Sequence, residues 1–489
     1  MHISPETRTS LLFQLSEILQ PEQLLSNKEE LRPYECDGLS AYKTLPIAVA
    51  LPDTIQQIQQ IMEICCRNNT PVVARGAGTG LSGGAQPHEG GIILGLARFN
   101  KILAIDPDNL TARVQPGVRN LAITEAVRQH KLYYAPDPSS QIACSIGGNV
   151  AENSGGVHCL KYGLTVHNIL ALKIVTVEGD LLTIGSNALD NTGYDLLGLF
   201  TGSEGMLGII VEVVVKLTPD AEDTHLLMAA FNDIEQAGNA VASIIANGII
   251  PAGLEMMDKL AISAAEDFAH AGYPRDAEAI LLCELDGSTI DVSEQTQKTK
   301  KILTEQGASF IKEAPDKTQQ AKLWAGRKAA FPAVGRISPD YYCMDGTIPR
   351  KHIAKVLKHI TKLSTEFDLR VANVFHAGDG NLHPLILYDA NKEGELEKAE
   401  QFGAEILRLC VKLGGSITGE HGVGNEKIEL MCEQFNTEEL TIFHAIKAAF
   451  DPNGILNPGK AVPSLHRCAE LGHMHVHNGE LPHPDIPRF

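Results

Sequence analysis

The chain contains a histidine hairpin signature, FHAGDGNLH, over residues 375–383. The dipeptide Asp379-Gly380 is a preferred two-residue hairpin turn, and a turn there would place His376 directly opposite His383. Directly opposed side chains of a hairpin have Cβ atoms about 5 Å apart, close enough for two imidazoles to share one ion. The alternative is that both histidines are only structural. The spacing therefore predicts one half of a metal site.

A second segment, GEHGVG over residues 419–424, supplies a carboxylate and a further histidine. We expect Glu420 to be the third metal ligand beside His376 and His383. Imidazole and carboxylate ligands suit zinc, iron or manganese, and three protein ligands leave an open coordination position, as in catalytic sites. His421, next in the sequence, could then act as a base on the bound substrate. Together the two segments predict a divalent metal beside a catalytic base.

Length and composition limit the classes of protein that remain. With 489 residues the chain exceeds what one hydrophobic core usually serves, so we expect two or three domains. A formal charge of −19 disfavours nucleic acid as a partner. Residues 1–19 predict an amphipathic helix and not a signal peptide, and LGIIVEVVVKL predicts a buried strand and not a membrane span. We expect a cytoplasmic protein, at most peripheral on the inner face of a membrane.

The ten cysteines have no CxxC spacing, although Cys65 and Cys66 are adjacent. This pattern predicts neither a disulfide framework nor an iron–sulfur ligand set. The chain therefore shows no cluster of its own that would carry electrons onward.

The first half of the chain contains a glycine-rich loop, GAGTGLSGGA, after a strand, helix, strand pattern. Gly78, Gly80 and Gly83 fit the GxGxxG motif of Rossmann folds. That motif needs a following helix to hold the pyrophosphate, whereas Pro87 and further glycines interrupt the chain before the next strand. We therefore expect the loop itself to bind phosphate through its backbone N–H groups.

Two more loops indicate an extended ligand. PDPSSQIACSIGGNVAENSGG, over residues 136–156, is long, polar and rich in glycine, and loops of this length inside compact domains are usually functional. GSEGMLGII, over residues 202–210, opens a strand. Three such loops favour a large phosphorylated cofactor, whereas any one of them alone could be an ordinary connection.

The sequences of these motifs and their order along the chain resemble those of one known superfamily. RGAGTGLSGGA, PDPSS, IGGNVAENSGG, YGLTVHNI, LFTGSEGMLGI, HAGDGNLH, GEHGVG and FDPNGILNPGK are similar to motifs of the FAD-linked oxidases of the vanillyl-alcohol oxidase and p-cresol methylhydroxylase superfamily. Within it the chain resembles the D-2-hydroxyacid dehydrogenase branch, and GRKAAFPAVGRISPDYYCMDGTIPR and HVHNGELPHP resemble the flavoprotein D subunits of glycolate oxidases. The resemblance implies an α+β fold with a two-part FAD-binding domain, an antiparallel-sheet substrate domain and a C-terminal segment that returns to the flavin.

With this resemblance, the chain divides into five expected parts. These are an N-terminal helical segment (residues 1–35), the FAD-binding domain (36–219), the substrate and metal domain (220–437), a flavin-contacting segment (438–465) and a histidine-rich tail (466–489). In the tail, His473, His475 and His477 alternate and could bind metal on one strand face, although a solvated tail is the simpler reading.

The resemblance also implies which residues bind the cofactor. Some members attach the flavin through a histidine in the first loop, but Thr79 stands there, which implies non-covalent FAD. The resemblance further implies that His376, His383 and Glu420 are the ligands of a divalent metal and that His421 is the base. The implied FAD-binding residues are Arg75, Gly76, Ala77, Gly78, Thr79, Gly80, Leu81, Ser82, Pro138, Ser139, Ser140, Gly147, Gly148, Asn149, Asn153, Ser154, Gly155, Gly205, Ile210 and Asn457.

One departure from the family concerns the substrate. Relatives that oxidise D-2-hydroxyglutarate carry a lysine and an asparagine where this chain has Cys343 and Leu385, so a distal carboxylate would lack partners. A small 2-hydroxyacid such as glycolate or D-lactate is therefore implied. We expect Arg327, with Arg336 as the second candidate, to hold its carboxylate by a bidentate pair. The alternative for either arginine is a surface ion pair.

The reaction implied is metal-assisted oxidation of glycolate to glyoxylate, or of D-lactate to pyruvate. His421 would take the hydroxyl proton, and the Cα hydrogen would leave either as hydride or as a proton. A D-lactate dehydrogenase, a nicotinamide dehydrogenase and a non-catalytic flavin-binding subunit are the alternatives. The resemblance further implies an iron–sulfur companion subunit and a second flavin-binding subunit, which would pass electrons to an external acceptor.

Overall fold

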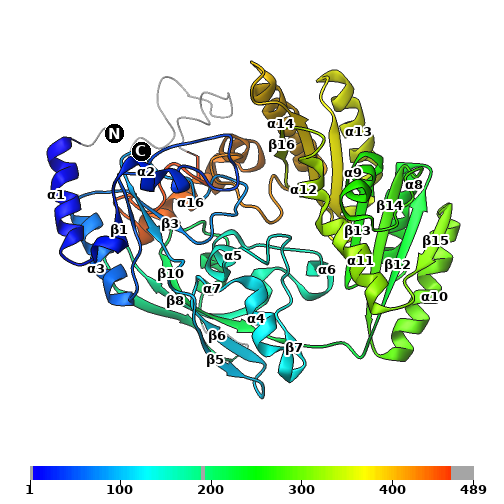
Figure 1. Ribbon diagram of the computed structural model, residues 1–489, viewed down its shortest axis with the longest axis horizontal. Helices are drawn as coiled ribbons and strands as arrows, with labels where there is room; N and C mark the ends of the chain where they lie inside the picture. The colour runs from blue at the N-terminus through cyan, green and yellow to red at the C-terminus, as the bar shows by residue number, and fades with distance from the viewer. Residues whose placement is uncertain (1–3, 189–192, 464–489) are drawn as a thin grey trace. The chain divides into compact units, whose positions relative to one another are not determined.

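The computed structural model describes residues 4–188 and 193–463, which form two compact units (Figure 1). The first unit contains the described residues up to Ser154, Leu164–Pro219 and those from Glu420 onward, and the second contains Gly155–Gly163 and Asp220–Gly419. We expected the substrate domain to run over residues 220–437. The chain instead returns to the first unit at Glu420, and residues 155–163 belong to the second unit. The histidine-rich tail lies outside the described residues.

One half of the first unit is a small sheet that packs against helices α1 and α3. Its strand order is β1-β2-β4-β3, with β2, β4 and β3 parallel. Helix α1 confirms the expected N-terminal helix, because Leu11 and Leu15, four residues apart, are fully buried on one face. The bounds are α1 (Pro5–Ser16), β1 (Leu24–Leu25), α2 (Lys28–Leu31), β2 (Ala48–Ala50), α3 (Ile55–Arg67), β3 (Val72–Arg75) and β4 (Ile92–Gly95).

No helix follows the glycine-rich loop. The chain passes from β3 to the parallel strand β4 through residues 76–91, which contain neither helix nor strand. A Rossmann connection would place a helix here to hold the pyrophosphate at its N-terminus. The prediction that the loop is not a Rossmann motif is therefore confirmed.

The other half of the first unit is an antiparallel sheet with the order β5-β6-β10-β8-β9. The apolar run near LGIIVEVVVKL forms its central strand β10, as predicted, and Val213 and Val215 are fully buried there. The bounds are β5 (Ile102–Asp106), β6 (Thr111–Val114), α4 (Asn120–Val127), β7 (Leu132–Tyr133), α5 (Ile146–Glu152), β8 (Ile169–Val175), β9 (Leu181–Gly185), α7 (Leu196–Phe200), β10 (Ile209–Lys216), β11 (Thr218–Pro219), α15 (Met431–Gln434) and α16 (Thr437–Phe450).

The second unit is built on one sheet with the order β15-β12-β14-β13-β18-β19-β16, and β17 pairs with β19. All of its pairings are antiparallel, which gives the α+β architecture expected. The bounds are α6 (Cys159–Tyr162), β12 (Asp223–Phe231), α8 (Ile234–Ala246), β13 (Gly253–Asp258), α9 (Lys259–Ala269), β14 (Ala279–Gly287), α10 (Thr289–Glu305), β15 (Phe310–Glu313), α11 (Lys317–Lys328), α12 (Ala330–Val334), β16 (Asp340–Cys343), β17 (Gly346–Thr347), α13 (Ile353–Glu366), β18 (Val371–His376), β19 (Asn381–Tyr388) and α14 (Glu395–Lys412).

The two faces of this sheet differ in chemistry. Paired residues of an antiparallel sheet lie on the same face, and the faces alternate along each strand. Glu255 pairs with His376, so these two share a face, whereas the neighbours Leu254 and Phe375 are buried on the other face. Helices α8, α10, α13 and α14 form a row along the sheet, and α11 sends polar side chains to the face of Glu255. The sheet therefore holds ionisable groups on one buried face.

The histidine hairpin has a different register from the one predicted. His376 pairs with Asn381, and His383 pairs with Val374, so the turn contains residues 377–380. The prediction that His376 directly opposes His383 is wrong. Because the register differs by two residues, both imidazoles still lie on the same face, as a diagonal pair.

No helix in the described part of the chain is both long enough and apolar enough to cross a membrane.

Candidate active site

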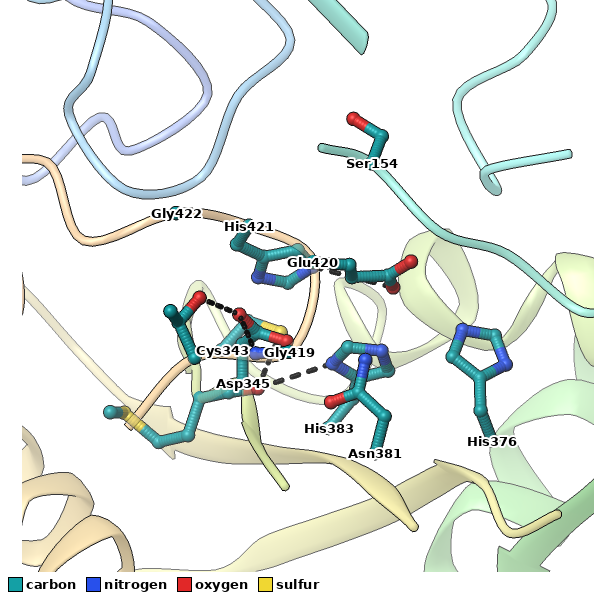
Figure 2. A network of polar contacts seen from close by, with 12 residues as sticks. Ser154, Cys343, Asp345, His376, Asn381, His383, Gly419, Glu420, His421 and Gly422 are labelled. Carbon is teal, nitrogen blue, oxygen red and sulfur yellow. Dashed lines mark hydrogen bonds and ion pairs between the residues drawn. The ribbon is translucent and has the colours of Figure 1, made fainter. Parts of the chain in front are cut away.

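The two histidines of the hairpin lie side by side on the polar face of the second unit's sheet (Figure 2). Their ring centroids are 5.0 Å apart and the rings are perpendicular, at 90°. Both side chains are buried, and one nitrogen of each lies within 4.8 Å of the other. Each ring uses Nδ1 elsewhere: His376 with Glu255 Oε1 at 2.8 Å, and His383 with the Met344 carbonyl at 3.3 Å. Metal-binding histidines are usually held in this way through the second ring nitrogen, so the pair fits a metal.

Glu255 is a central residue that sequence reasoning missed. It is 1% exposed, and its second oxygen, Oε2, lies 2.6 Å from Arg327 Nη2. Burial by itself raises the pKa of this carboxyl, but the charges of His376 and Arg327 hold the pKa below its ordinary value. The available signal was one carboxylate inside an apolar strand, GLEMM. An ionised Glu255 therefore links the histidine pair to a buried arginine.

Arg327 is buried deeply enough to be part of a site and not of the surface. It is 1% exposed, and its Nε and Nη1 have no hydrogen-bond partner among the described residues. Buried N–H groups without partners are costly, so they favour a ligand with acceptor oxygens. Arg336, by contrast, is exposed and lies 4.4 Å over the ring of Phe268. Of the two candidate arginines, only Arg327 reaches the residues beside the histidine pair.

Asp345 fixes the chain at the point where it leaves the second unit. It is fully buried, and its Oδ2 accepts hydrogen bonds from Thr418 Oγ1 at 2.6 Å and from the Gly419 N–H at 3.0 Å. A Cβ on Gly419 would come within 2.5 Å of Asn381 Oδ1, so only glycine fits this approach. Gly419 is thus held on the sheet that carries His383, and Glu420 is the next residue in the chain.

Cys343 is a further ligand candidate that the sequence did not indicate. It lies in β16 on the same face as His383, because it pairs with Leu385 of β19. Its Sγ lies within 4.8 Å of a ring nitrogen of His383. A thiol is therefore available beside the histidine pair, in addition to the ligands predicted.

Glu420 and His421 begin the last segment of the first unit. Their side chains are 10% and 14% exposed, and Glu420 Oε1 lies 3.9 Å from His421 Nε2. That separation exceeds a hydrogen bond, so the two side chains do not hold each other in a fixed pair.

In the first unit, the glycine-rich loop is shaped for an anion. The backbone N–H groups of residues 76–82 donate no hydrogen bond to the described part of the chain. Arg75 supports the loop from within, because its Nη1 donates to the carbonyl of Cys36 at 2.7 Å, and Gly78, with φ of 70°, passes so close to its guanidinium that a Cβ would clash. Free N–H groups on a rigid glycine turn are suited to binding phosphate.

Several other predicted cofactor residues form the framework of their own loops. Gly147 donates to the Pro116 carbonyl at 2.8 Å, Asn120 donates to the Asn149 side chain at 3.1 Å, and Asn153 accepts from the Val166 N–H at 2.9 Å. Gly205 has φ of 71°, Ile210 is buried in β10, Pro138–Ser140 lie in a turn, Ser154 ends the first segment of its unit, and Gly155 belongs to the second unit.

Asn457, predicted near the flavin edge, is buried, and its Nδ2 donates to the carbonyls of Gly84 at 2.9 Å and Glu204 at 2.7 Å. Lys460, which sequence reasoning missed, lies beside it, and burial lowers the pKa of its amine to about 8. Both residues come from FDPNGILNPGK. This motif therefore braces the glycine-rich loop from inside the first unit.

Comparison with known proteins identifies two matching families. Residues 220–461 match the family "FAD linked oxidases, C-terminal domain", and residues 46–185 match "FAD binding domain". The chain is 63% identical over 482 residues to "Glycolate oxidase subunit GlcD" of Escherichia coli strain K12, covering 99% of this chain and 97% of that protein. It is 31% identical over 452 residues to a D-lactate dehydrogenase of Anaerostipes hadrus, covering 90% and 95%.

Among solved structures, p-cresol methylhydroxylase with substrate bound has a TM-score of 0.80 at 18% identity, covering 95% of this chain and 98% of that one. This likeness concerns the fold alone, and the family follows from the sequence relatives. The chain belongs to the FAD-linked oxidases, as its motifs predicted, and has the fold of the vanillyl-alcohol oxidase and p-cresol methylhydroxylase superfamily.

Proposed function

We propose that the chain oxidises a small 2-hydroxyacid to the 2-oxoacid with non-covalent FAD, and that glycolate is its preferred substrate. The observation that carries this proposal is the buried row Arg327, Glu255, His376, with His383 beside it. It offers a cation for a carboxylate next to imidazoles for a metal. The glycolate oxidase relative supports glycolate, and the D-lactate dehydrogenase relative supports D-lactate as the second candidate.

The metal site of this proposal consists of His376, His383 and Glu420. Support for the histidines is their shared face and their Nδ1 contacts, which hold each ring in the way that is usual for metal-binding histidines. Support for Glu420 is its peptide bond to Gly419, which Asp345 holds on the sheet. The donor set suits zinc, iron or manganese, and such an ion, when bound, acidifies an alcohol that chelates it.

Arg327 and His421 have separate roles in the proposed reaction. Arg327 holds the substrate carboxylate through Nε and Nη1, while Glu255 keeps the guanidinium in place through Nη2. His421 takes the hydroxyl proton on a ring nitrogen. FAD, when bound, would supply the acceptor for the two electrons, which leave with the Cα hydrogen, and the N–H groups of residues 76–82 would hold its pyrophosphate.

The same face of the sheet argues for a small substrate. Cys343 and Leu385 pair across β16 and β19 on the face of His383, and both are buried. Neither offers a charge or an amide to a second carboxylate. A dicarboxylate such as 2-hydroxyglutarate would bury an unpaired charge there, which is strongly unfavourable.

We further propose that reduced flavin is reoxidised by partner proteins, namely an iron–sulfur subunit and a second flavin-binding subunit, in a cytoplasmic complex that is at most peripheral on the membrane. The support is that the E. coli relative is named as a subunit. A nicotinamide dehydrogenase is disfavoured, because no helix follows the glycine-rich loop.

The proposal is tested by turnover of the purified, FAD-loaded chain with a redox dye. Glycolate and D-lactate should reduce the dye, L-lactate and D-2-hydroxyglutarate should not, and oxygen consumption without the dye should be slow. No turnover with any 2-hydroxyacid would refute the function. Fast oxygen consumption matched to substrate would refute the need for partners while leaving the oxidation intact.

A further inference from the structure

Glu204 in the loop GSEGMLGII makes an unusual contact with the segment that carries His421. Its side chain is buried, and each carboxylate oxygen accepts one backbone hydrogen bond: Oε1 from the Val423 N–H and Oε2 from the Gly424 N–H, both at 2.7 Å. Residues 420–427 contain neither helix nor strand, so their conformation depends on contacts of this kind.

The backbone of Glu204 is itself held in a sparsely populated conformation. Its φ is 51°, its N–H donates to the Ala151 carbonyl at 2.8 Å, and its carbonyl accepts from Asn457 Nδ2 at 2.7 Å. A positive φ at a residue other than glycine is uncommon and persists only where the surrounding contacts determine it. Glu204 is therefore placed by several segments at once.

The same contacts reach the glycine-rich loop. Asn457 Nδ2 also donates to the Gly84 carbonyl at 2.9 Å, and Lys460 Nζ donates to that carbonyl at 3.2 Å and to the carbonyl of Gln86. The Asn425 N–H donates to the Ser82 carbonyl at 2.9 Å.

The last glycine of GEHGVG, Gly424, is required by a close contact, because a Cβ there would lie 2.1 Å from the Ser82 carbonyl oxygen. The loop assigned to the cofactor phosphates and the segment that carries His421 therefore share one buried polar network.

We propose that Glu204 is a positioning residue that couples cofactor binding at the glycine-rich loop to the placement of His421. The inference rests on the proposed function, in which that loop holds FAD and His421 is the base. A ligand that orders the loop also orders residues 422–425 through Glu204, Asn457 and Ser82. By linkage, fixing residues 422–425 tightens the binding of the cofactor by the same factor.

The test compares Glu204→Gln with the full-length wild-type protein. The amide keeps the shape of the side chain but has one acceptor, and its NH₂ meets the second N–H. Glu212→Gln is the matched control, since Glu212 is also a buried carboxylate of the first unit but pairs with Arg113 and Lys173. Circular dichroism checks folding. Hydrogen exchange of residues 420–427 is then measured with and without FAD, and the affinity of each protein for FAD is measured by titration.

In the wild type and in Glu212→Gln, FAD should slow exchange of residues 420–427. In Glu204→Gln this protection should be lost, and FAD should bind about 5- to 150-fold more weakly, the usual range of a coupling. With saturating FAD, kcat should fall on the order of 10²-fold, as misplacement of a catalytic group does, while KM stays constant because Arg327 is intact. A purely structural role would lower thermal stability without this division between kcat and KM.

Equal FAD-dependent protection in Glu204→Gln and wild type would overturn the coupling. If Glu204→Gln does not fold, Asn457→Gly replaces it, because glycine accepts the φ of 44° at this position while the amide links to Gly84 and Glu204 are removed. Glu204-dependent protection in a protein that oxidises no 2-hydroxyacid would refute the proposed function and leave the coupling standing.

Discussion

Glu255 lies between the imidazole of His376 and the guanidinium of Arg327. Its Oε1 is 2.8 Å from His376 Nδ1, and its Oε2 is 2.6 Å from Arg327 Nη2. Since all three side chains are at most 5% exposed, the carboxylate fixes the imidazole and the guanidinium relative to each other. The proposed metal ligand and the proposed carboxylate-binding arginine thus depend on one residue.

Replacement of Glu255 should therefore disturb metal and substrate together. In Glu255→Gln one acceptor is lost and an NH₂ group faces a donor, so we expect metal content and kcat/KM to fall on the order of 10- to 100-fold. Elemental analysis and steady-state kinetics measure the two effects. Glu278→Gln, an exposed partner of Lys259 in the same unit, is the control and should match the wild type. Normal metal content and kinetics in Glu255→Gln would remove Glu255 from the site.

Replacement of either hairpin histidine should remove the metal without removing the flavin. We expect His376→Ala and His383→Ala to lose the metal and most turnover while they keep FAD, because the glycine-rich loop lies in the other unit. Elemental analysis and the visible spectrum of each variant are sufficient. A variant that has no detectable metal but near-normal turnover would show that the histidines are structural.

The two candidate arginines give a matched pair of variants. Arg327→Lys should raise KM for every 2-hydroxyacid tested, because an ammonium group cannot reproduce the planar fork of guanidinium, and the expected rise is on the order of 10-fold. Arg336→Lys should leave KM unchanged, since Arg336 is exposed over Phe268. If the KM values of Arg327→Lys equalled those of the wild type, another group would have to bind the carboxylate.

The sequence predicted the faces of the second unit's sheet better than its pairings. The Asp-Gly dipeptide marked the hairpin correctly, but the register was wrong, because the turn contains four residues and is held by one local hydrogen bond and one tertiary contact. Asp379 accepts from the Asn381 N–H at 3.1 Å, and a Cβ on Gly378 would lie 2.4 Å from Leu160. Since the register differed by two residues, the histidines stayed on one face.

Glu255 and Glu204 could not be found by motif reasoning. Glu255 contacts His376 from a position 121 residues away, and Glu204 contacts Val423 from a position 219 residues away. Neither glutamate shares a sequence motif with the residue that it contacts. Composition and periodicity predict which face a side chain takes, whereas contacts of this kind follow from the sheet order and the loop packing of the whole unit.

The depressed pKa of Lys460 predicts a pH window of stability. Its amine has a pKa of about 8 in the folded chain, against an ordinary value of 10.5, because it is buried. Below pH 8 the amine is charged in both states and the burial penalty is complete. Between pH 8 and 10.5 the unfolded chain holds the proton and the folded chain does not, so the free energy of unfolding rises with pH.

Calorimetry of the FAD-saturated wild type and of Lys460→Met at pH 7.5 and 9.5 tests this window. Between these two pH values the free energy of unfolding of the wild type should rise by about 2 kcal/mol relative to that of the variant, because it rises by about 1.4 kcal/mol per pH unit above pH 8. A difference between the two proteins that does not change with pH would mean that Lys460 titrates at its ordinary pKa.

In the proposed function, this chain itself oxidises a small 2-hydroxyacid at its flavin. Anaerobic addition of glycolate to the purified, FAD-loaded chain tests it most directly, because neither a dye nor a partner protein takes part. We predict that the visible absorbance of the flavin bleaches with glycolate, and more slowly with D-lactate, and that removal of the metal by a chelator abolishes the bleaching. Flavin that stays oxidised in the metal-loaded protein with every D- and L-2-hydroxyacid of the panel would contradict the account.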